Sequence, residues 1–358
     1  MTSPTQTPAH PCAGCGASVA FAPGTAVLRC PYCGYEQRIA APTRQIREHS
    51  FDAFLAKPRV QTLAPHQFTC PGCGARTESD ALSRACQFCG TPLVADTSGG
   101  AQIAPEAVLP FGLNRNGARS SLRAWVRSRW FAPTRLKRVT EAEAMKSTYL
   151  PHWTFDAGTV SHYVGQRGRH HWTKESYVNH NGHNATRNVR KTIWRPASGT
   201  VSRFFDDVLV RATTRVSPEQ LDKLKPWPLE RAVPFDPNWL AGHHSLRHDI
   251  EPQGGMELAK AVMYQVIESD CRRDIGGDVQ RVHRVDTQYA DVAFKLVLLP
   301  VWIGTYVFGG KTYQVLINGV TGEVQGDRPF SALKITIAAL IAIALVSSVV
   351  WLYLSKNP

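Results

Sequence analysis

The 358-residue sequence predicts an α+β protein with a sheet-rich body between two distinct ends. Three observations support this fold class. Four Cys-x-x-Cys-Gly motifs lie within residues 12–90, and a charge-free apolar run covers residues 335–354. Between them, strand-like stretches are separated by Gly-containing turns. We therefore expect two N-terminal four-cysteine zinc ribbons, an antiparallel-sheet-rich body and one C-terminal transmembrane helix.

The cysteine motifs form two pairs with similar spacing. Fourteen residues separate the first two motifs, and twelve separate the second two. This spacing suits a short β-hairpin that holds four thiolates around one tetrahedral Zn²⁺. The Gly that follows each motif suits a turn residue with positive φ. The predicted ligands of two structural Zn²⁺ ions are Cys12, Cys15, Cys30, Cys33, Cys70, Cys73, Cys86 and Cys89.

Disulfides, a redox pair and an iron–sulfur cluster are the alternatives for these cysteines. Residues 1–11 lack the apolar segment of a secretion signal, so we expect a reducing cytosol, which favours metal over disulfides. A redox Cys-x-x-Cys normally occurs singly in a βαβ unit. All eight ligand positions would be used, so both sites are expected to be closed and structural. Each unit is poor in apolar residues, so the metal would supply folding free energy.

The C-terminal apolar run predicts a membrane span. Twenty residues at ~1.5 Å each cover ~30 Å, the hydrocarbon thickness of a bilayer. Trp351 and Tyr353 lie where an interfacial aromatic belt is expected. Arg328 and Lys334 precede the run and only Lys356 follows it, which favours a cytosolic body and a short external tail. We expect a single-pass, tail-anchored protein of the cytoplasmic (inner) membrane.

The net charge of +13 belongs mainly to one segment. Residues 101–215 contain 19 Lys or Arg and 7 Asp or Glu, whereas residues 1–100 contain 8 and 6. The cysteine units therefore lack the cation excess that is typical of zinc modules that bind nucleic acid.

One predicted helix of the basic segment, from Asn114 to Arg129, has a cationic stripe. Leu122, Trp125 and Val126 form its apolar side. A solvated surface helix is the plain interpretation. Binding of an anionic surface is the functional one, and a membrane tether favours lipid headgroups over nucleic acid. The stripe consists of Arg115, Arg119, Arg123 and Arg127.

Antiparallel strands and one further helix are predicted for the rest of the body. An Asn-Gly turn and a Gly-Gly turn each indicate a hairpin. The helix is expected over residues 255–274, with Gly276 at its C-terminal cap. The predicted strands are residues 149–164, 170–178, 185–195, 201–210, 292–308 and 311–317.

These elements suggest seven segments along the chain. They are zinc ribbon 1 (1–40), a linker with a short helix (41–67), zinc ribbon 2 (68–95), a basic α+β subdomain (105–240), a second α+β subdomain (241–331), the transmembrane helix (332–354) and an external tail (355–358).

Catalytic constellations are not predicted, so we do not expect an enzyme. The sequence has no Gly-rich phosphate loop, nucleophile elbow or His-Glu-x-x-His motif. His243, His244 and His248 would place two imidazoles at i, i+4 on a helix, without a carboxylate or Cys at ligand spacing. Asp206 and Asp207 are expected to point to opposite faces of a strand.

Other reactive or charged side chains have structural interpretations. Cys271 lies in the predicted helix and is expected to be a buried thiol. The charged residues at the end of that helix are expected to form salt bridges. Histidines near the Asn-Gly turn are expected to be solvated; they are His170, His171, His180 and His183.

The chain resembles a family of bacterial membrane proteins with paired N-terminal zinc ribbons, described as transcription-factor-IIB-type zinc-ribbon proteins and sometimes as primosomal-helicase-like. The absence of any ATPase motif argues against a helicase. The resemblance implies a cytosol-facing membrane protein with no established catalytic activity. In some bacteria such proteins are encoded near band-7 or phage-shock-type proteins. Besides the cysteine motifs, the matching segments are residues 130–133, 149–157, 202–209, 272–278, 299–302 and 318–326.

Together these observations predict a membrane-anchored zinc-ribbon adaptor. Its expected partners are the lipid bilayer and a protein, for which the resemblance suggests the band-7 or phage-shock type, with anionic lipid as a further ligand. The alternative hypothesis is a membrane-tethered nucleic-acid-binding protein.

Overall fold

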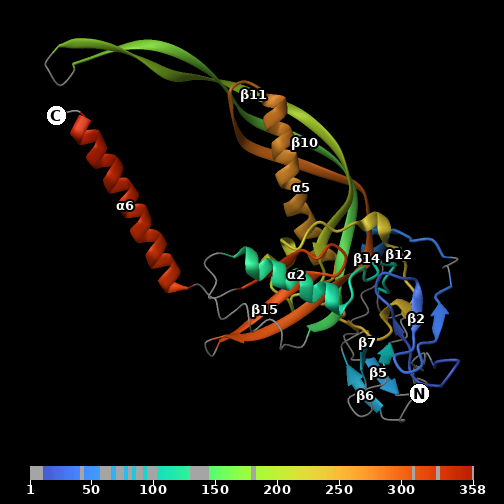
Figure 1. Ribbon diagram of the computed structural model, residues 1–358. Coiled ribbons are helices and arrows are strands. Elements are labelled where there is room, and N and C mark those ends of the chain that lie inside the picture. Colours follow the sequence, from blue (N-terminus) through green and yellow to red (C-terminus); the bar gives the residue numbers. More distant parts are fainter. Residues whose placement is uncertain are drawn as a thin grey trace.

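The computed structural model has the α+β architecture that the sequence predicts (Figure 1). A long curved sheet forms the body, one long helix lies against it, and a C-terminal helix stands apart. The structure describes residues 11–40, 44–56, 66–69, 76–79, 83–85, 92–94, 103–129, 145–178, 183–308, 311–327 and 331–356.

The N-terminal unit is a three-stranded antiparallel sheet. Its strands are β1 (Ala20–Phe21), β2 (Val27–Arg29) and β3 (Glu36–Arg38). An isolated bridge pairs Pro11 with Ser18. Each of the first two cysteine motifs therefore lies in the turn of an antiparallel pair.

Short elements connect this unit to the body. β4 (His49–Ser50) pairs with the main sheet and leads into α1 (Phe51–Leu55), whose first turn is capped by the Ser50 side chain. Two antiparallel pairs follow. They are β5 (His66–Thr69) with β6 (Arg76–Ser79), and β7 (Ser83–Ala85) with β8 (Pro92–Val94).

Three long strands dominate the main sheet. β10 (Met145–Val178) runs antiparallel to β11 (Asn184–Arg211) on one side and to β14 (Val279–Phe308) on the other. β15 (Lys311–Asn318) and β16 (Val324–Gly326) continue the sheet beyond β14. The segments 105–240 and 241–331 thus contribute strands to one sheet. Short strands at the sheet are β9 (Ala107–Val108), β12 (Val233–Pro234) and β13 (His244–Ser245).

Both predicted hairpins are confirmed, but the strands are longer than the sequence suggested. Residues 149–164 and 170–178 belong to one strand, β10, which has 34 residues. The glycines between them permit close contact with the neighbouring strand instead of a turn. A Cβ at Gly165 would lie 2.3 Å from the Arg281 carbonyl oxygen, and one at Gly168 would lie 2.5 Å from Val279.

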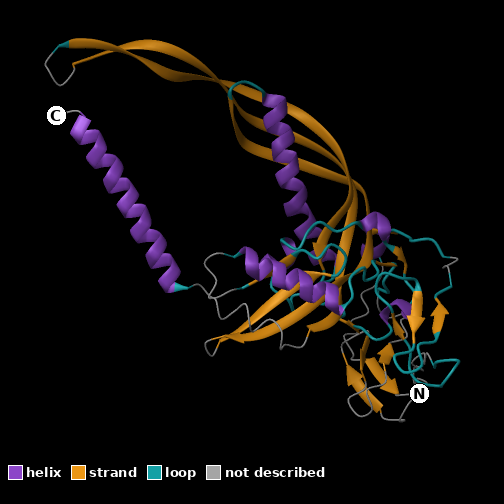
Figure 2. Ribbon diagram, in the orientation of Figure 1, coloured by secondary structure: helices purple, strands orange, loops and turns teal. Residues whose placement is uncertain are grey.

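Helix α5 (Pro252–Ile275) covers one face of the long strands (Figure 2). It begins three residues before the predicted start and ends, as predicted, at Gly276, which has φ 65°. Its buried side packs on aromatic side chains of β10 and β14, including Trp153, Phe155 and Phe294. The buried positions along the helix are Pro252, Gly255, Met256, Ala259, Met263, Ile267, Cys271 and Ile275. The prediction that the Cys271 thiol is buried is thus confirmed.

Helix α2 (Arg115–Ser128) has the predicted bounds and cap. The Asn114 side chain accepts a hydrogen bond of 2.9 Å from the Gly117 N–H. Leu122 and Val126 are buried, and Trp125 is half-buried. The irregular stretch near residues 225–242 contains two 3₁₀ turns, η1 (Leu229–Arg231) and η2 (Pro237–Leu240), and follows α4 (Pro218–Asp222).

Helix α6 (Ala332–Lys356) contains the predicted apolar run. Within it, residues 336–353 are long and apolar enough to cross a membrane, and none of this stretch is buried against the body. Large apolar side chains such as Leu340 and Trp351 are exposed. An exposed apolar helix of this length favours a bilayer as its surroundings.

Candidate metal centre

The first two cysteine motifs adopt the same local backbone structure. The Gly16 N–H donates to the Cys12 carbonyl at 2.8 Å, and the Gly34 N–H donates to the Cys30 carbonyl at 3.1 Å. Both glycines have positive φ, 71° and 75°, as the motif predicts. These tight turns bring the two thiols of each motif to the same side of the chain.

The two turns face each other and bring four sulfurs together. The Sγ atoms of Cys12 and Cys33 are 3.4 Å apart, and those of Cys15 and Cys30 are 3.6 Å apart. All four sulfurs lie within 4.8 Å of one another. Zn–S bonds of ~2.3 Å in a tetrahedron require sulfurs ~3.8 Å apart. The quartet therefore fits a tetrahedral zinc ion.

Backbone hydrogen bonds favour the thiolate form of one of the four cysteines, Cys30. Cys12 and Cys30 are buried, whereas Cys15 and Cys33 are exposed. The Cys33 backbone N–H, the strongest influence on the Cys30 thiol, lowers its pKa to about 6, although burial opposes this. The Gly14 N–H also points at the Cys12 sulfur, at 3.3 Å. Amide donors of this kind favour thiolates, the form that binds metal.

The cysteine unit is docked on the body through a shared core. Phe21 packs edge-on against Trp239, with ring centroids 5.0 Å apart. The Phe21 N–H donates to the Ala241 carbonyl at 2.9 Å, and the Gly24 N–H donates to the Phe111 carbonyl at 2.7 Å. Cys12 and Cys30 belong to the same hydrophobic cluster as these body residues. The core that the short unit lacks is therefore supplied in part by the body.

The second predicted ligand set is not placed by the structure. Cys70, Cys73, Cys86 and Cys89 lie outside the described residues, between β5 and β6 and between β7 and β8. Among the residues that are described, the cysteines form one such cluster. The second zinc site remains a prediction from motif spacing.

A second group of titratable side chains was not predicted from the sequence. Carboxylate oxygens of Glu48, Asp156 and Asp207 lie within 4.8 Å of one another on the sheet. The Lys295 ammonium donates to Glu48 at 2.7 Å and to Asp207 at 2.5 Å. The single Lys295 ammonium therefore offsets part of the negative charge of these carboxylates.

Burial and proximity redistribute the protons of this cluster. Burial is the main cause that raises the pKa of Asp156 to about 7, and its hydrogen bond with Glu48 adds to the effect. The same hydrogen bond holds the pKa of Glu48 below its usual value. Burial acts to lower the pKa of Lys295, but its hydrogen bonds to Asp207 and Glu48 outweigh burial and raise it. Asp156 therefore keeps its proton when Glu48 has lost its own.

The alternation of side chains along a regular strand did not predict this cluster, because a β-bulge interrupts the strand pairing there. The register of β10 against β11 shifts between Phe155 and Ala157, and Asp207 has φ 50°. The Asp207 N–H then donates to an Asp156 carboxylate oxygen at 2.7 Å. Asp206 is exposed. Glu48, Asp156, Asp207 and Lys295 are far apart in the sequence, and no motif predicted that they would be in contact.

The histidines at 243–248 do not lie on a helix, so that possibility is wrong. His244 belongs to β13, and the buried His243 ring stacks on Phe111 at 4.6 Å. The buried His248 ring packs edge-on against Trp153. Burial, the largest cause in both cases, lowers the pKa values of His243 and His248 to about 4. Both are aromatic packing residues held in their neutral form.

The four arginines of the stripe, Arg115, Arg119, Arg123 and Arg127, lie on helix α2 as predicted, but their environments differ. Arg115 donates to the Met145 carbonyl at 2.8 Å. Arg119 is half-buried, whereas Arg123 and Arg127 are exposed.

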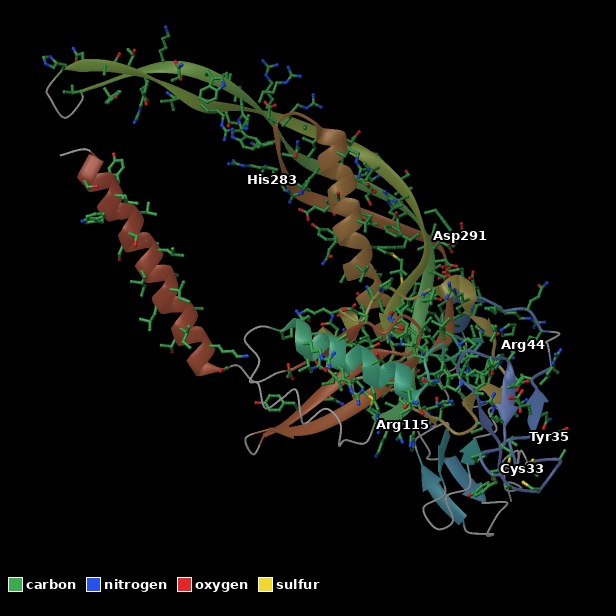
Figure 3. All side chains as sticks on the ribbon, in the orientation of Figure 1. Cys33, Tyr35, Arg44, Arg115, His283 and Asp291 are labelled. Atoms are coloured by element: carbon green, nitrogen blue, oxygen red, sulfur yellow. The ribbon has the colours of Figure 1, made fainter. Side chains whose placement is uncertain are left out.

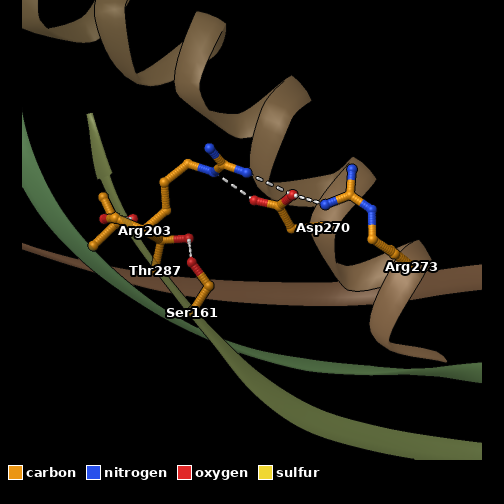
Figure 4. Close-up of polar contacts among 6 residues, drawn as sticks. Ser161, Arg203, Asp270, Arg273 and Thr287 are labelled. Atoms are coloured by element: carbon orange, nitrogen blue, oxygen red, sulfur yellow. Dashed lines mark hydrogen bonds and ion pairs between the residues drawn. The ribbon is translucent and has the colours of Figure 1, made fainter. Parts of the chain in front are cut away.

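The charged end of α5 forms the expected salt bridges (Figure 4). Asp270 accepts from Arg203 of β11 at 2.6 Å and from Arg273 at 3.0 Å. Asp274 accepts a 2.5 Å hydrogen bond from the Tyr163 hydroxyl. The contacts with Arg203 and Tyr163 hold α5 on the sheet, so these charged side chains have a structural role.

Comparisons with known proteins give a relative but no function. The chain is 24% identical over 330 residues to YdjG of Bacillus subtilis (strain 168), described as an uncharacterized protein; the match covers 91% of each chain. No protein family model matches the chain. No solved structure matches it either.

Proposed function

We propose that the chain is a membrane-anchored, zinc-binding adaptor that presents a cytosolic surface for protein partners. The observation that carries this proposal is the Cys12–Cys33 quartet, which has the spacing of a closed tetrahedral site and shares a hydrophobic core with the body. A site with four protein ligands keeps no position for substrate, so its role is structural. The proposal therefore involves no catalysis.

The exposed side of the cysteine unit supports recruitment of a protein. Tyr32 is 82% exposed and Tyr35 is 44% exposed, although both belong to the hydrogen-bonded turn around Cys33. Figure 3 shows Cys33 and Tyr35 at the edge of the N-terminal unit. Exposed aromatic side chains on a preorganised backbone are favourable anchors for protein interfaces. The zinc ion would hold this surface in one shape.

Membrane attachment supports the adaptor role. Helix α6 supplies an anchor, and the basic residues Arg328 and Lys334, which precede its apolar stretch, favour a cytosolic body. The family resemblance suggests band-7 or phage-shock-type proteins as partners and a role in envelope stress or membrane organisation. The repeated motif spacing supports a second zinc ion at the Cys70–Cys89 quartet. The α2 arginine stripe supports the alternative, a membrane-tethered nucleic-acid-binding protein.

Site-specific photo-crosslinking in intact membranes tests the adaptor. A photoreactive phenylalanine analogue at position 32 should give a discrete protein adduct. The matched control is the same analogue at Tyr264, which is 43% exposed on α5. The adduct should disappear when Cys30 and Cys33 are both changed to Ser. The same adducts from both positions, or none from position 32, would contradict recruitment through the cysteine unit.

A further inference from the structure

The outer end of the β10–β11 hairpin projects beyond the rest of the sheet (Figures 1 and 2). The last pair between β10 and β14 joins Gly168 to Val279, and α5 ends at Ile275. Beyond that point, in the part of the chain that the structure describes, residues 169–178 pair only with residues 184–193. We call these two segments the outer ribbon. At ~3.3 Å per residue, it extends ~30 Å.

The outer ribbon is strongly basic. It contains five Lys or Arg and one acidic residue, Glu175. Glu175 pairs with Arg187 at 3.1 Å and with Lys191 at 3.6 Å. No described carboxylate lies within ion-pair distance of Arg169, Lys174 or Arg190. The ribbon thus presents uncompensated positive charge to its surroundings.

The two faces of the outer ribbon differ in the side chains that lie beside the cations. Residues directly opposite each other share a face, so Trp172 lies beside Arg190, and Lys174 lies beside Asn188. Val178 follows on the same face at the outer end. Trp172 is 69% exposed and Val178 is 65% exposed. This Trp172 face combines cations and large apolar side chains without a carboxylate, whereas Glu175 lies on the opposite face.

We propose that the Trp172 face binds the anionic lipid headgroups of the membrane that α6 enters. The positive charge of Lys174 and Arg190 complements anionic headgroups, and Trp172 has the amphipathic ring that favours the bilayer interface. The exposed Val178 gains from contact with the acyl boundary more than from contact with solvent or phosphate. Because α6 would tether the body to a bilayer, the ribbon meets headgroups at high effective concentration.

This proposal is independent of the cysteine unit. It assigns lipid contact to the outer ribbon, whereas the sequence had suggested the α2 stripe. The ribbon would act as a second membrane contact that restricts how the body is oriented above the bilayer. Loss of zinc would therefore leave the ribbon contact intact, so the two proposals fail separately.

Hydrogen exchange on the full-length protein in nanodiscs tests the inference. Discs of phosphatidylcholine alone are compared with discs that also contain phosphatidylglycerol. Exchange in the outer ribbon should be slower in the anionic discs, and added salt should reverse the effect by screening. Changing Lys174→Gln and Arg190→Gln together should weaken the added protection roughly fivefold per removed cation. Unchanged exchange in α5 would show that the variant is folded.

A matched charge change distinguishes the ribbon from α2. Arg119→Gln with Arg127→Gln removes the same charge from the helix stripe and should leave ribbon protection unchanged. Equal ribbon exchange in both types of disc would overturn the proposal. So would equal loss of protection in the α2 variant. Slower ribbon exchange with duplex DNA in neutral discs, without slowing in anionic discs, would assign the ribbon to nucleic acid instead.

Discussion

The first cysteine unit and the outer ribbon are both small antiparallel structures, but different interactions hold them together. The cysteine unit has strands of two or three residues, a four-sulfur cluster and a core shared with the body through Phe21. The outer ribbon has longer strands and neither of these supports. An isolated two-stranded ribbon is marginally stable in water. The comparison indicates that short strands suffice where a four-sulfur cluster and a docking surface support them, whereas the outer ribbon relies on its cross-strand contacts.

The largest expected effect comes from removing the metal site of the cysteine unit. Changing Cys30 and Cys33 together to Ser should reduce the zinc content from two ions per chain to one, measured by elemental analysis of the full-length protein. Structural zinc contributes about 10–16 kcal/mol of apparent binding free energy in small domains, so residues 18–39 should lose their exchange protection. Exchange in the outer ribbon should not change.

Two outcomes would contradict this view of the cysteine unit. One is a variant that keeps both zinc ions. The other is a variant that loses zinc but retains full exchange protection at β1–β3, which would mean that docking on the body alone is sufficient.

A smaller effect separates the docked aromatic residue from the projecting one. Phe21→Ala removes the contact with Trp239 from a buried core and should cost about 3–5 kcal/mol of local stability at β1–β3. Trp172→Ala removes an exposed side chain from the outer ribbon and should change the free energy of unfolding by less than about 0.5 kcal/mol. Hydrogen exchange and chemical denaturation in a neutral detergent measure both. Similar costs for the two variants would indicate that the ribbon has a covered face.

An effect smaller than that of Phe21→Ala concerns the pH dependence of stability and Asp156, which lies at the covered end of the β10–β11 hairpin. Asp156 has a raised pKa of about 7, so between about pH 4 and that value the folded protein retains a proton that the unfolded chain releases. The contribution of Asp156 to the free energy of unfolding therefore falls as the pH rises from about 4 to about 7. Asp156→Asn mimics the protonated carboxyl and should flatten the slope, which should raise stability near pH 8 by at least about 1 kcal/mol.

The neighbouring Asp206 provides the control. Asp206 is exposed and adjacent to the bulge, so Asp206→Asn makes the same chemical change outside the cluster. Glu48 has a lowered pKa, so its contribution to stability is lost only at more acidic pH. It therefore does not mask the pH dependence that Asp156 causes. Denaturant unfolding across the window measures both variants. An unaltered slope in Asp156→Asn would show that Asp156 is ionised in the folded protein.

The sequence identified features that depend on local spacing. The Cys-x-x-Cys-Gly motif predicted the turn at Gly16, and helical periodicity with Asn114 as a cap predicted α2. The Asn-Gly and Gly-Gly turns predicted both hairpins because a turn of this type needs only two adjacent residues. These signals reside in a few consecutive positions and need no tertiary information.

Features that depend on distant contacts were missed for a physical reason. The predicted strands ended at residue 164 and resumed at residue 170, but β10 continues through Gly165, whose lack of a side chain accommodates the backbone of Arg281, a residue distant in sequence. Lys295 and Glu48 are 247 positions apart, and their meeting depends on the pairing of β14 with β4. Asp207 joins them only because a bulge turns its backbone. Register and bulges are properties of strand pairs, which one strand's sequence does not specify.

The shared core beneath the cysteine unit has an evolutionary consequence. Phe21 covers Trp239, and Gly242 lies so close to Ala20 that a Cβ there would be 2.5 Å from the Ala20 side chain. A descendant that lost the cysteine unit would leave Trp239 and Leu240 open to solvent. Such a deletion would cost stability unless polar residues replaced these two body residues. The unit and the body surface beneath it should therefore be inherited, or lost, together.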